Sequence, residues 1–186
     1  MKNLKNILIL VIISFSLVAC SIKGNNYNPD IETIDYLNNY ELKSVSTKKI
    51  ENTKLDTTSI TLRGAKMISP YGNSFSDYIN QSLQIQLSQN DLYSKDSNYI
   101  VSTEIIKNDI NIWGFSEAYC DLKVKFEINE GNRILYSDSI ELKHDFPSHF
   151  VGQIAIENGI NNYPIAVKKL IKKFLNDQRV INLLKK

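Results

Sequence analysis

An alternation of apolar and polar side chains over residues 119–128 constrains the fold more than any other feature of this chain. Apolar side chains occupy every second position, at Cys120, Leu122, Val124, Phe126 and Ile128, and the positions between them carry charged residues or tyrosine. Successive side chains of a strand point to opposite faces of a sheet. The pattern therefore predicts a strand of an antiparallel sheet that has one face against a core and the other in water.

Shorter runs predict further strands on both sides of this one. Residues 57–63 are alternating and β-branched, and residues 99–106 are rich in Ile, Val and Thr. Turn-forming residues at 129–132 predict a tight connection to a returning strand over residues 134–142. Asp138 interrupts the apolar face of that strand, so we expect a bulge or a strand end there.

A first helix is predicted after a turn at residues 69–73. Ser74 and Asp77 have the spacing of a helix-capping pair, and apolar residues recur every four positions from Phe75 to Leu87. This pattern predicts an amphipathic helix that ends near residues 89–90.

The last third of the chain is predicted to be helical. Its apolar stripe over residues 156–174 contains Pro164, which predicts either a kink or a new helix that starts at Asn161 or Asn162. Asp177 is a candidate cap for a short final helix. The order strand, helix, three strands, helix predicts an α+β fold, in which a mainly antiparallel sheet of about four strands has two main helices packed on one face.

The N-terminus has the pattern of a secretory leader. Lys2 and Lys5 precede an apolar run of 13 residues, 7–19, which is shorter than the roughly 20 residues of a membrane-spanning helix. A short N-terminal membrane anchor is the alternative. The run ends in Leu-Val-Ala-Cys at residues 17–20, which resembles the lipobox of bacterial lipoproteins. That resemblance implies a signal peptide over residues 1–19 and acylation of Cys20, with palmitate or a similar fatty acid.

Ser21 follows the cysteine and bears on location. In lipoproteins of two-membrane bacteria, Asp at that position favours retention in the inner membrane. The resemblance therefore implies an outer-membrane lipoprotein that faces the periplasm, with the inner membrane and the cell surface as alternatives.

Charge and length limit the remaining possibilities. Removal of the leader leaves 20 basic and 20 acidic residues, and this balance argues against a nucleic-acid partner. We expect residues 20–56, which are rich in Asn, to form an acylated N-terminus and tether, and residues 57–186 to form a single domain. The alternative is that part of the tether, residues 31–40, packs on the domain.

Several segments together resemble a family of small, largely uncharacterised bacterial lipoproteins over roughly residues 57–184. The segments are Leu-Arg-Gly at 62–64 with Ser-Pro-Tyr-Gly at 69–72, the helix from Phe75, residues 150–156, and residues 162–177. In build, the family is similar to the lipopolysaccharide-assembly lipoprotein and to auxiliary lipoproteins of lipid-transport systems. The resemblance brings no catalytic residues with it.

The residues that could carry chemistry are few. His144 and His149 flank Asp145, but a strand end and a loop do not fix a tetrahedral metal site, so we expect neither a metal nor another cofactor. Cys120 lies on the apolar face of its strand, and we expect a buried, inert thiol. With Cys20 acylated, Cys120 has no partner in the chain for a disulfide.

Two aromatic segments are candidates for contact with a partner or ligand. Trp113, Phe115 and Tyr119 surround Gly114, and they either touch a partner or an acyl chain or pack into the core at a strand end. A second group, Phe146, His149 and Phe150, either forms a docking loop or steers the chain from strand to helix. Four lysines of the last long helix are predicted to form a solvated face, with anionic lipid head groups as an alternative: Lys168, Lys169, Lys172 and Lys173.

These features favour a non-enzymatic, membrane-anchored lipoprotein that serves as a structural or accessory component of a cell-envelope assembly or transport system, with an envelope protein as partner. The alternative is a binding module for a lipid or another small apolar ligand, held in a pocket between sheet and helices. An envelope hydrolase would require His149 to meet an acid and either a serine or Cys120 in the fold.

Overall fold

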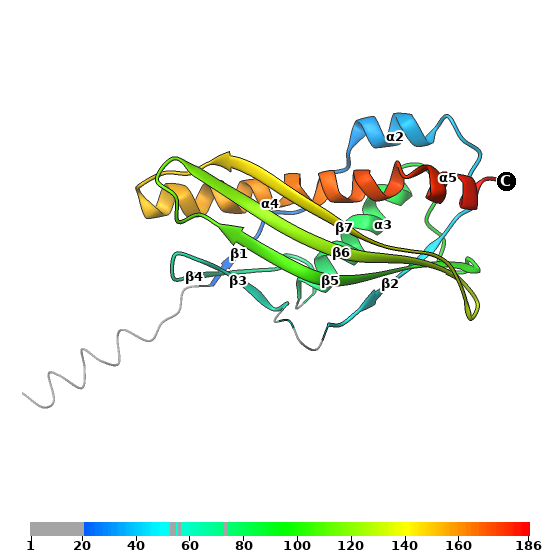
Figure 1. Ribbon diagram of the computed structural model, residues 1–186, viewed down its shortest axis with the longest axis horizontal. Helices are drawn as coiled ribbons and strands as arrows, with labels where there is room; N and C mark the ends of the chain where they lie inside the picture. The colour runs from blue at the N-terminus through cyan, green and yellow to red at the C-terminus, as the bar shows by residue number, and fades with distance from the viewer. Residues whose placement is uncertain (1–20, 53–54, 56, 73) are drawn as a thin grey trace, which may run out of the picture.

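The computed structural model describes residues 21–52, 55, 57–72 and 74–186. It is an α+β fold with one four-stranded and one three-stranded sheet, as Figure 1 shows. The predicted leader and Cys20 lie outside the described residues. None of the helices in the described ranges is both long enough and apolar enough to cross a membrane.

The larger sheet confirms the alternation in the sequence. Its strands are β2 (Ser46–Ile50), β5 (Tyr99–Asn111), β6 (Glu117–Glu130) and β7 (Arg133–Pro147), in the order β2-β5-β6-β7. The pairs β5–β6 and β6–β7 are antiparallel, whereas β2 joins β5 in parallel. All five apolar residues of the alternation in β6 are buried. Polar side chains on the opposite face form ion pairs such as Lys107–Asp121 and Lys125–Glu127.

The predicted interruption of the returning strand at Asp138 is wrong. Strand β7 continues without a break through this residue. No bulge is needed, because the Asp138 carboxylate forms an ion pair with Arg179 on the side of the sheet that faces the helices. The register shifts lie elsewhere, between Ile128 and Asn129 in one ladder and between Ile105 and Lys107 in the other.

Helices α3 (Phe75–Ser88) and α4 (Gly152–Leu175) pack on one face of this sheet (Figure 1). As predicted, Ser74 caps α3: its hydroxyl oxygen accepts a hydrogen bond from the Asp77 backbone N–H at 3.2 Å. Between α4 and the sheet, the rings of Phe126 and Phe174 are stacked with their centroids 4.4 Å apart. Rings from both helices also meet edge to face, as Phe75 and Tyr163 do.

Helix α4 runs unbroken for 24 residues and contains Pro164, so no new helix begins at Asn161 or Asn162. Proline removes one backbone donor from a helix. Burial of Pro164 itself and of side chains on the same turn of the helix, those of Tyr163 and Val167, offsets that loss. Helix α5 (Gln178–Leu184) follows, and the predicted cap is confirmed: an Asp177 carboxylate oxygen accepts from the Arg179 backbone N–H at 2.8 Å.

The smaller sheet consists of β1 (Ser21–Lys23), β4 (Ala65–Ile68) and β3 (Ser59–Leu62), in that order. Strands β3 and β4 form a hairpin whose two turn residues, Arg63 and Gly64, have φ of 46° and 90°. Strand β1 pairs with β4 in parallel, with Ser21 beside Lys66. This sheet lies next to the large sheet through contacts between β3 and β5.

The predicted tether is wrong for residues 21–50, which belong to the fold. They form β1, α2 (Ile31–Leu37) and β2, and they bury side chains in the core: Tyr27, Leu37, Leu42 and Val45. The Tyr27 hydroxyl donates to the Gln86 side-chain oxygen at 2.7 Å, which ties this segment to α3. The alternative in which the segment packs on the domain is therefore the correct one. Burial of these apolar groups stabilises the packed form more than a solvated coil.

Candidate functional site

Three strongly exposed aromatic side chains gather where β5, β6, β7 and α4 connect. Trp113 is 69% exposed, Phe115 82% and Phe150 69%. Val151 and Ile154 are also exposed, and the His149 ring stacks on Phe150 at 4.6 Å between centroids. We call this surface the aromatic edge; its members are Trp113, Phe115, His149, Phe150, Val151 and Ile154.

Arg63, from the turn between β3 and β4, holds the two aromatic segments together. Its Nε donates to the Ile112 carbonyl oxygen at 2.8 Å and its Nη2 to that of Gly114 at 3.1 Å. Its Nη1 donates to the Phe150 carbonyl oxygen at 3.3 Å. One guanidinium therefore fixes the backbone on both sides of the aromatic edge.

The two segments also bond to each other. The Ser148 backbone N–H donates to the Ser116 carbonyl oxygen at 2.9 Å, and the Ser148 hydroxyl donates to Ile112 at 3.3 Å. Gly114 is required here, because a Cβ at this position would lie 2.1 Å from the Glu117 carbonyl oxygen. The aromatic edge is thus exposed by a backbone that hydrogen bonds and close packing hold in place.

The structure separates the predicted contact residues. The alternative in which Trp113 and Phe115 pack into the core is wrong. Both side chains are exposed, because their loop extends beyond the last paired residues of β5 and β6. Tyr119 is half-buried on the outer face, with Lys143 Nζ 4.4 Å from its ring centroid. Phe146 is only 6% exposed, because alternation in β7 turns it toward the core, but it lines an open hollow at this end of the sheet.

An open hollow of about 820 Å³ lies beside the aromatic edge. Its lining combines polar and aromatic side chains, among them Asn111, Tyr119, Lys143 and Asp145. The Asn111 side-chain amide donates to the Tyr119 hydroxyl at 3.2 Å. The hollow adds hydrogen-bonding groups to the rim of the apolar surface.

The two histidines do not form a common site. His144 Nε2 lies 3.2 Å from the Asn162 side-chain oxygen, and its Nδ1 lies 3.1 Å from Lys169 Nζ. Burial, followed by the charge of Lys169, lowers the pKa of His144 below its usual value. His149 instead accepts a hydrogen bond from the Val151 backbone N–H at 3.0 Å. The described residues contain no group of three side chains that could hold a metal ion.

The prediction of a buried thiol at Cys120 is confirmed. This side chain is fully buried, and burial raises the pKa of its thiol to about 12. At neutral pH the group is protonated and inaccessible, so it lacks the thiolate that nucleophilic chemistry requires.

The lysines of α4 are only partly a solvated face. Lys172 pairs with Glu32 and lies 3.7 Å from Asp30, both at the start of α2. Lys173 Nζ donates to the Glu141 carbonyl oxygen of β7 at 3.0 Å. These contacts tie α4 to its neighbours and favour a structural role over a lipid contact.

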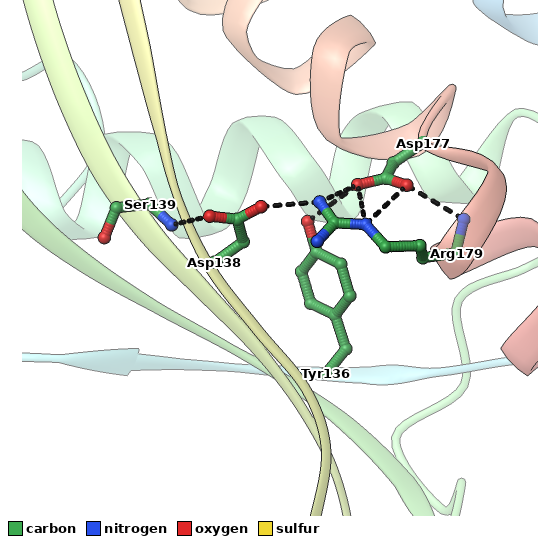
Figure 2. Close-up of polar contacts among 5 residues, drawn as sticks. All are labelled: Tyr136, Asp138, Ser139, Asp177 and Arg179. Carbon is green, nitrogen blue, oxygen red and sulfur yellow. Dashed lines mark hydrogen bonds and ion pairs between the residues drawn. The ribbon is translucent and has the colours of Figure 1, made fainter.

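The polar cluster in Figure 2 was not anticipated from the sequence. Arg179 bridges Asp177 and Asp138, each at 2.5 Å, and its guanidinium lies 5.1 Å from the Tyr136 ring centroid. The Tyr136 hydroxyl donates to Asp177 at 3.1 Å. The hydrogen bond from the Arg179 side chain has the largest effect on the Asp177 carboxyl and lowers its pKa. Burial opposes this effect, and the bond from the Arg179 backbone N–H adds to it. The cluster fastens α5 to β7, and its only sign in the sequence was Asp138 on an apolar face.

This chain shares its fold with a solved bacterial protein. That protein, from Xanthomonas campestris and described under the family DUF330, superposes with a TM-score of 0.60 at 10% identity over 88% of this chain and 96% of its own. A minor lipoprotein from Acinetobacter baumannii gives a TM-score of 0.47 at 16% identity, over 78% of this chain and 96% of its own. A hypothetical protein from Chlamydia trachomatis gives 0.49 at 7% identity, over 76% and 98%. No protein-family model and no curated protein matches the sequence.

The Xanthomonas likeness covers nearly the whole of that chain and extends beyond residues 57–186 of this one. This supports the inclusion of the N-terminal elements in the fold. At 10% identity the likeness concerns the fold and not the surface.

Proposed function

We propose that this protein is a lipid-anchored accessory component of a cell-envelope assembly or transport system, held through acyl chains on Cys20 at the periplasmic face of the outer membrane. The observation that carries the proposal is the position of Ser21. This residue directly follows the lipobox cysteine and already opens β1 of the folded domain. The anchor therefore adjoins the fold, as suits a protein that acts at a membrane surface.

The side chains that could perform chemistry support a non-enzymatic role. Cys120 is buried, and His144 contacts Asn162 of α4. His149 accepts a hydrogen bond from the Val151 backbone N–H of its own loop. What the surface offers instead is a fixed apolar edge and an ion-paired sheet face. Both are suited to contact and not to catalysis.

The ligand-binding alternative gains no support from the interface between sheet and helices. The stacked rings of Phe126 and Phe174 lie fully buried within it. A cavity where α5 meets α2 and α3, lined by Leu37, Leu87 and Val180 among others, holds only about 10 Å³. That is far below the several hundred Å³ of a pocket for a small-molecule ligand.

The anchoring is tested by Cys20→Ala in the full chain, with radiolabelled palmitate and membrane fractionation. We expect an unprocessed, unlabelled precursor, whereas the matched control Cys120→Ala is processed and labelled like wild type. Normal maturation of the Cys20→Ala chain would refute the anchor.

The accessory role is tested by affinity isolation of the tagged chain from crosslinked, intact envelopes at normal expression. We expect one envelope protein to be recovered in defined stoichiometry with wild type and to be lost with Cys20→Ala. Recovery of no partner from wild-type envelopes would contradict the role, whatever the result of the labelling.

A further inference from the structure

We propose that the aromatic edge docks on the lipid bilayer that holds the acyl anchor, with Trp113, Phe115 and Phe150 in the interfacial layer. The inference rests on the proposed acylation of Cys20 and adds to it a second, protein-based contact with the membrane. It also sets the orientation of the domain.

The described domain begins close to the β3–β4 hairpin. Ser21 pairs with Lys66, which lies just past the Arg63–Gly64 turn of the β3–β4 hairpin. Arg63 in that turn bonds the carbonyl oxygens of Gly114 and Phe150. The start of β1 and the aromatic edge therefore belong to the same end of the molecule, and Figure 1 shows the β3–β4 hairpin and the start of α4 at that end.

Covalent geometry brings the anchor to this end. Successive Cα atoms are about 3.8 Å apart, so the acylated residue is one such step from Ser21. Since β1 is paired with β4, no flexible stretch of described residues separates the anchor from the domain. The bilayer surface is then within a few residues' reach of the aromatic edge.

The chemistry of this end fits the interface of a bilayer. Tryptophan and other aromatic residues favour the depth of lipid head groups, and exposed apolar side chains beside a lipid anchor add to membrane binding. Exposed lysines, Lys23 and Lys66, lie on β1 and β4, and none of the three strands of this sheet carries an acidic residue. These two lysines complement lipid phosphates, whereas Glu117 and Asp145 line the hollow beside the aromatic edge.

The chain provides its own probe, because Trp113 is its single tryptophan. The acylated full-length protein is reconstituted into vesicles of phosphatidylethanolamine and phosphatidylglycerol, with or without lipids brominated near the head group. We expect brominated lipid to reduce Trp113 fluorescence at least twofold. We also expect a blue shift relative to the acylated protein in detergent.

The matched control moves the tryptophan to the far end of the sheet. Ile134 is 59% exposed just after the β6–β7 turn. It is separated from the aromatic edge by the length of β6, about 40 Å at roughly 3.3 Å per residue. The double variant Trp113→Phe, Ile134→Trp should float with the vesicles and show no quenching. A second variant, Phe115→Ser with Phe150→Ser, changes only exposed rings; it should still float, with weaker quenching of Trp113.

Flotation separates the two proposals. A chain that fails to float refutes the anchoring, and docking falls with it. A chain that floats while Trp113 is quenched no more than Ile134→Trp overturns docking alone. A blue shift that grows with protein concentration and is insensitive to bromine identifies a second copy on the aromatic edge. A blue shift that requires an added envelope protein identifies a protein partner. Either result overturns membrane docking.

Discussion

Replacement of Arg63 with Ala tests whether one guanidinium holds the aromatic edge in place. The variant loses three hydrogen bonds, to the carbonyl oxygens of Ile112, Gly114 and Phe150. The three losses are unequal. Ile112 retains the Ser148 hydroxyl as a donor, and the bond to Phe150 is exposed, so water replaces the lost donor there.

The magnitude follows from these differences. A hydrogen bond from a charged donor contributes roughly 1.5–3 kcal/mol, and solvent exposure brings the value toward the lower end. The partly buried bond to Gly114 sets most of the loss, with smaller additions from the other two. We expect the free energy of unfolding to fall by about 2–3 kcal/mol. The positive φ of Arg63 is strained for alanine as for arginine, so the backbone contribution cancels in this comparison.

The assay is urea denaturation followed by far-UV circular dichroism, with local order at the edge read from Trp113 fluorescence anisotropy. Arg63→Lys keeps the charge but has a single donor group, so it should recover part of the loss. Lys66→Ala removes an exposed cation from the neighbouring strand and should change stability by less than about 0.5 kcal/mol. If Arg63→Ala resembles Lys66→Ala in both readouts, the guanidinium does not hold the loops together.

Three further predictions concern the body of the domain. Phe174→Ala should lower the free energy of unfolding by about 4 kcal/mol, measured by urea denaturation, because it empties a fully buried stacking position. In a Cys20→Ala chain, the Cys120 thiol should resist iodoacetamide at pH 8 until the protein unfolds, as mass spectrometry would show. Asp177→Asn keeps an oxygen to cap α5 but loses the charge that faces Arg179, and should cost about 1 kcal/mol at pH 7. The folded pKa of Asp177 is lowered, so its contribution is present above about pH 4 and lost as pH falls further; the variant's deficit should vanish over that range in pH-dependent denaturation.

The sheet and helices could be predicted from the sequence where the pattern is local. The alternation at residues 119–128 records one buried and one wet face, and it needs no knowledge of the partner strand. Ser74 and Asp177 cap helices through bonds to backbone groups two or three residues away, which is also a local signal. The new helix expected at Asn161 or Asn162 does not form. Helix propensity disfavours proline inside a helix, but the burial that offsets this cost depends on packing against the sheet, which is not a local signal.

The N-terminal elements could not be predicted in this way, because their partners are distant in the chain. Tyr27 bonds to Gln86, 59 residues away, and β2 pairs in parallel with β5, with Ser46 opposite Ile100. Isolated apolar residues among asparagines carry no period from which to infer such contacts. The aromatic edge could be predicted in part, because its aromatic residues mark it as a candidate contact surface by their type. The role of Arg63 in holding this edge could not be predicted, because its hydrogen bonds go to backbone carbonyl oxygens, which every residue possesses.

Residues 21–50 of the expected tether are folded, and this limits how far the domain can extend from an anchor at Cys20. A coil of about 20 residues would span roughly 25 Å and allow the domain to turn freely above the membrane. With β1 opening at Ser21, the fold itself must supply the reach. Strand β6 is 14 residues long and extends about 40 Å from the aromatic edge to the β6–β7 turn. If the aromatic edge rests on the bilayer, as proposed, the ion-paired face of the large sheet is held at a fixed orientation to it.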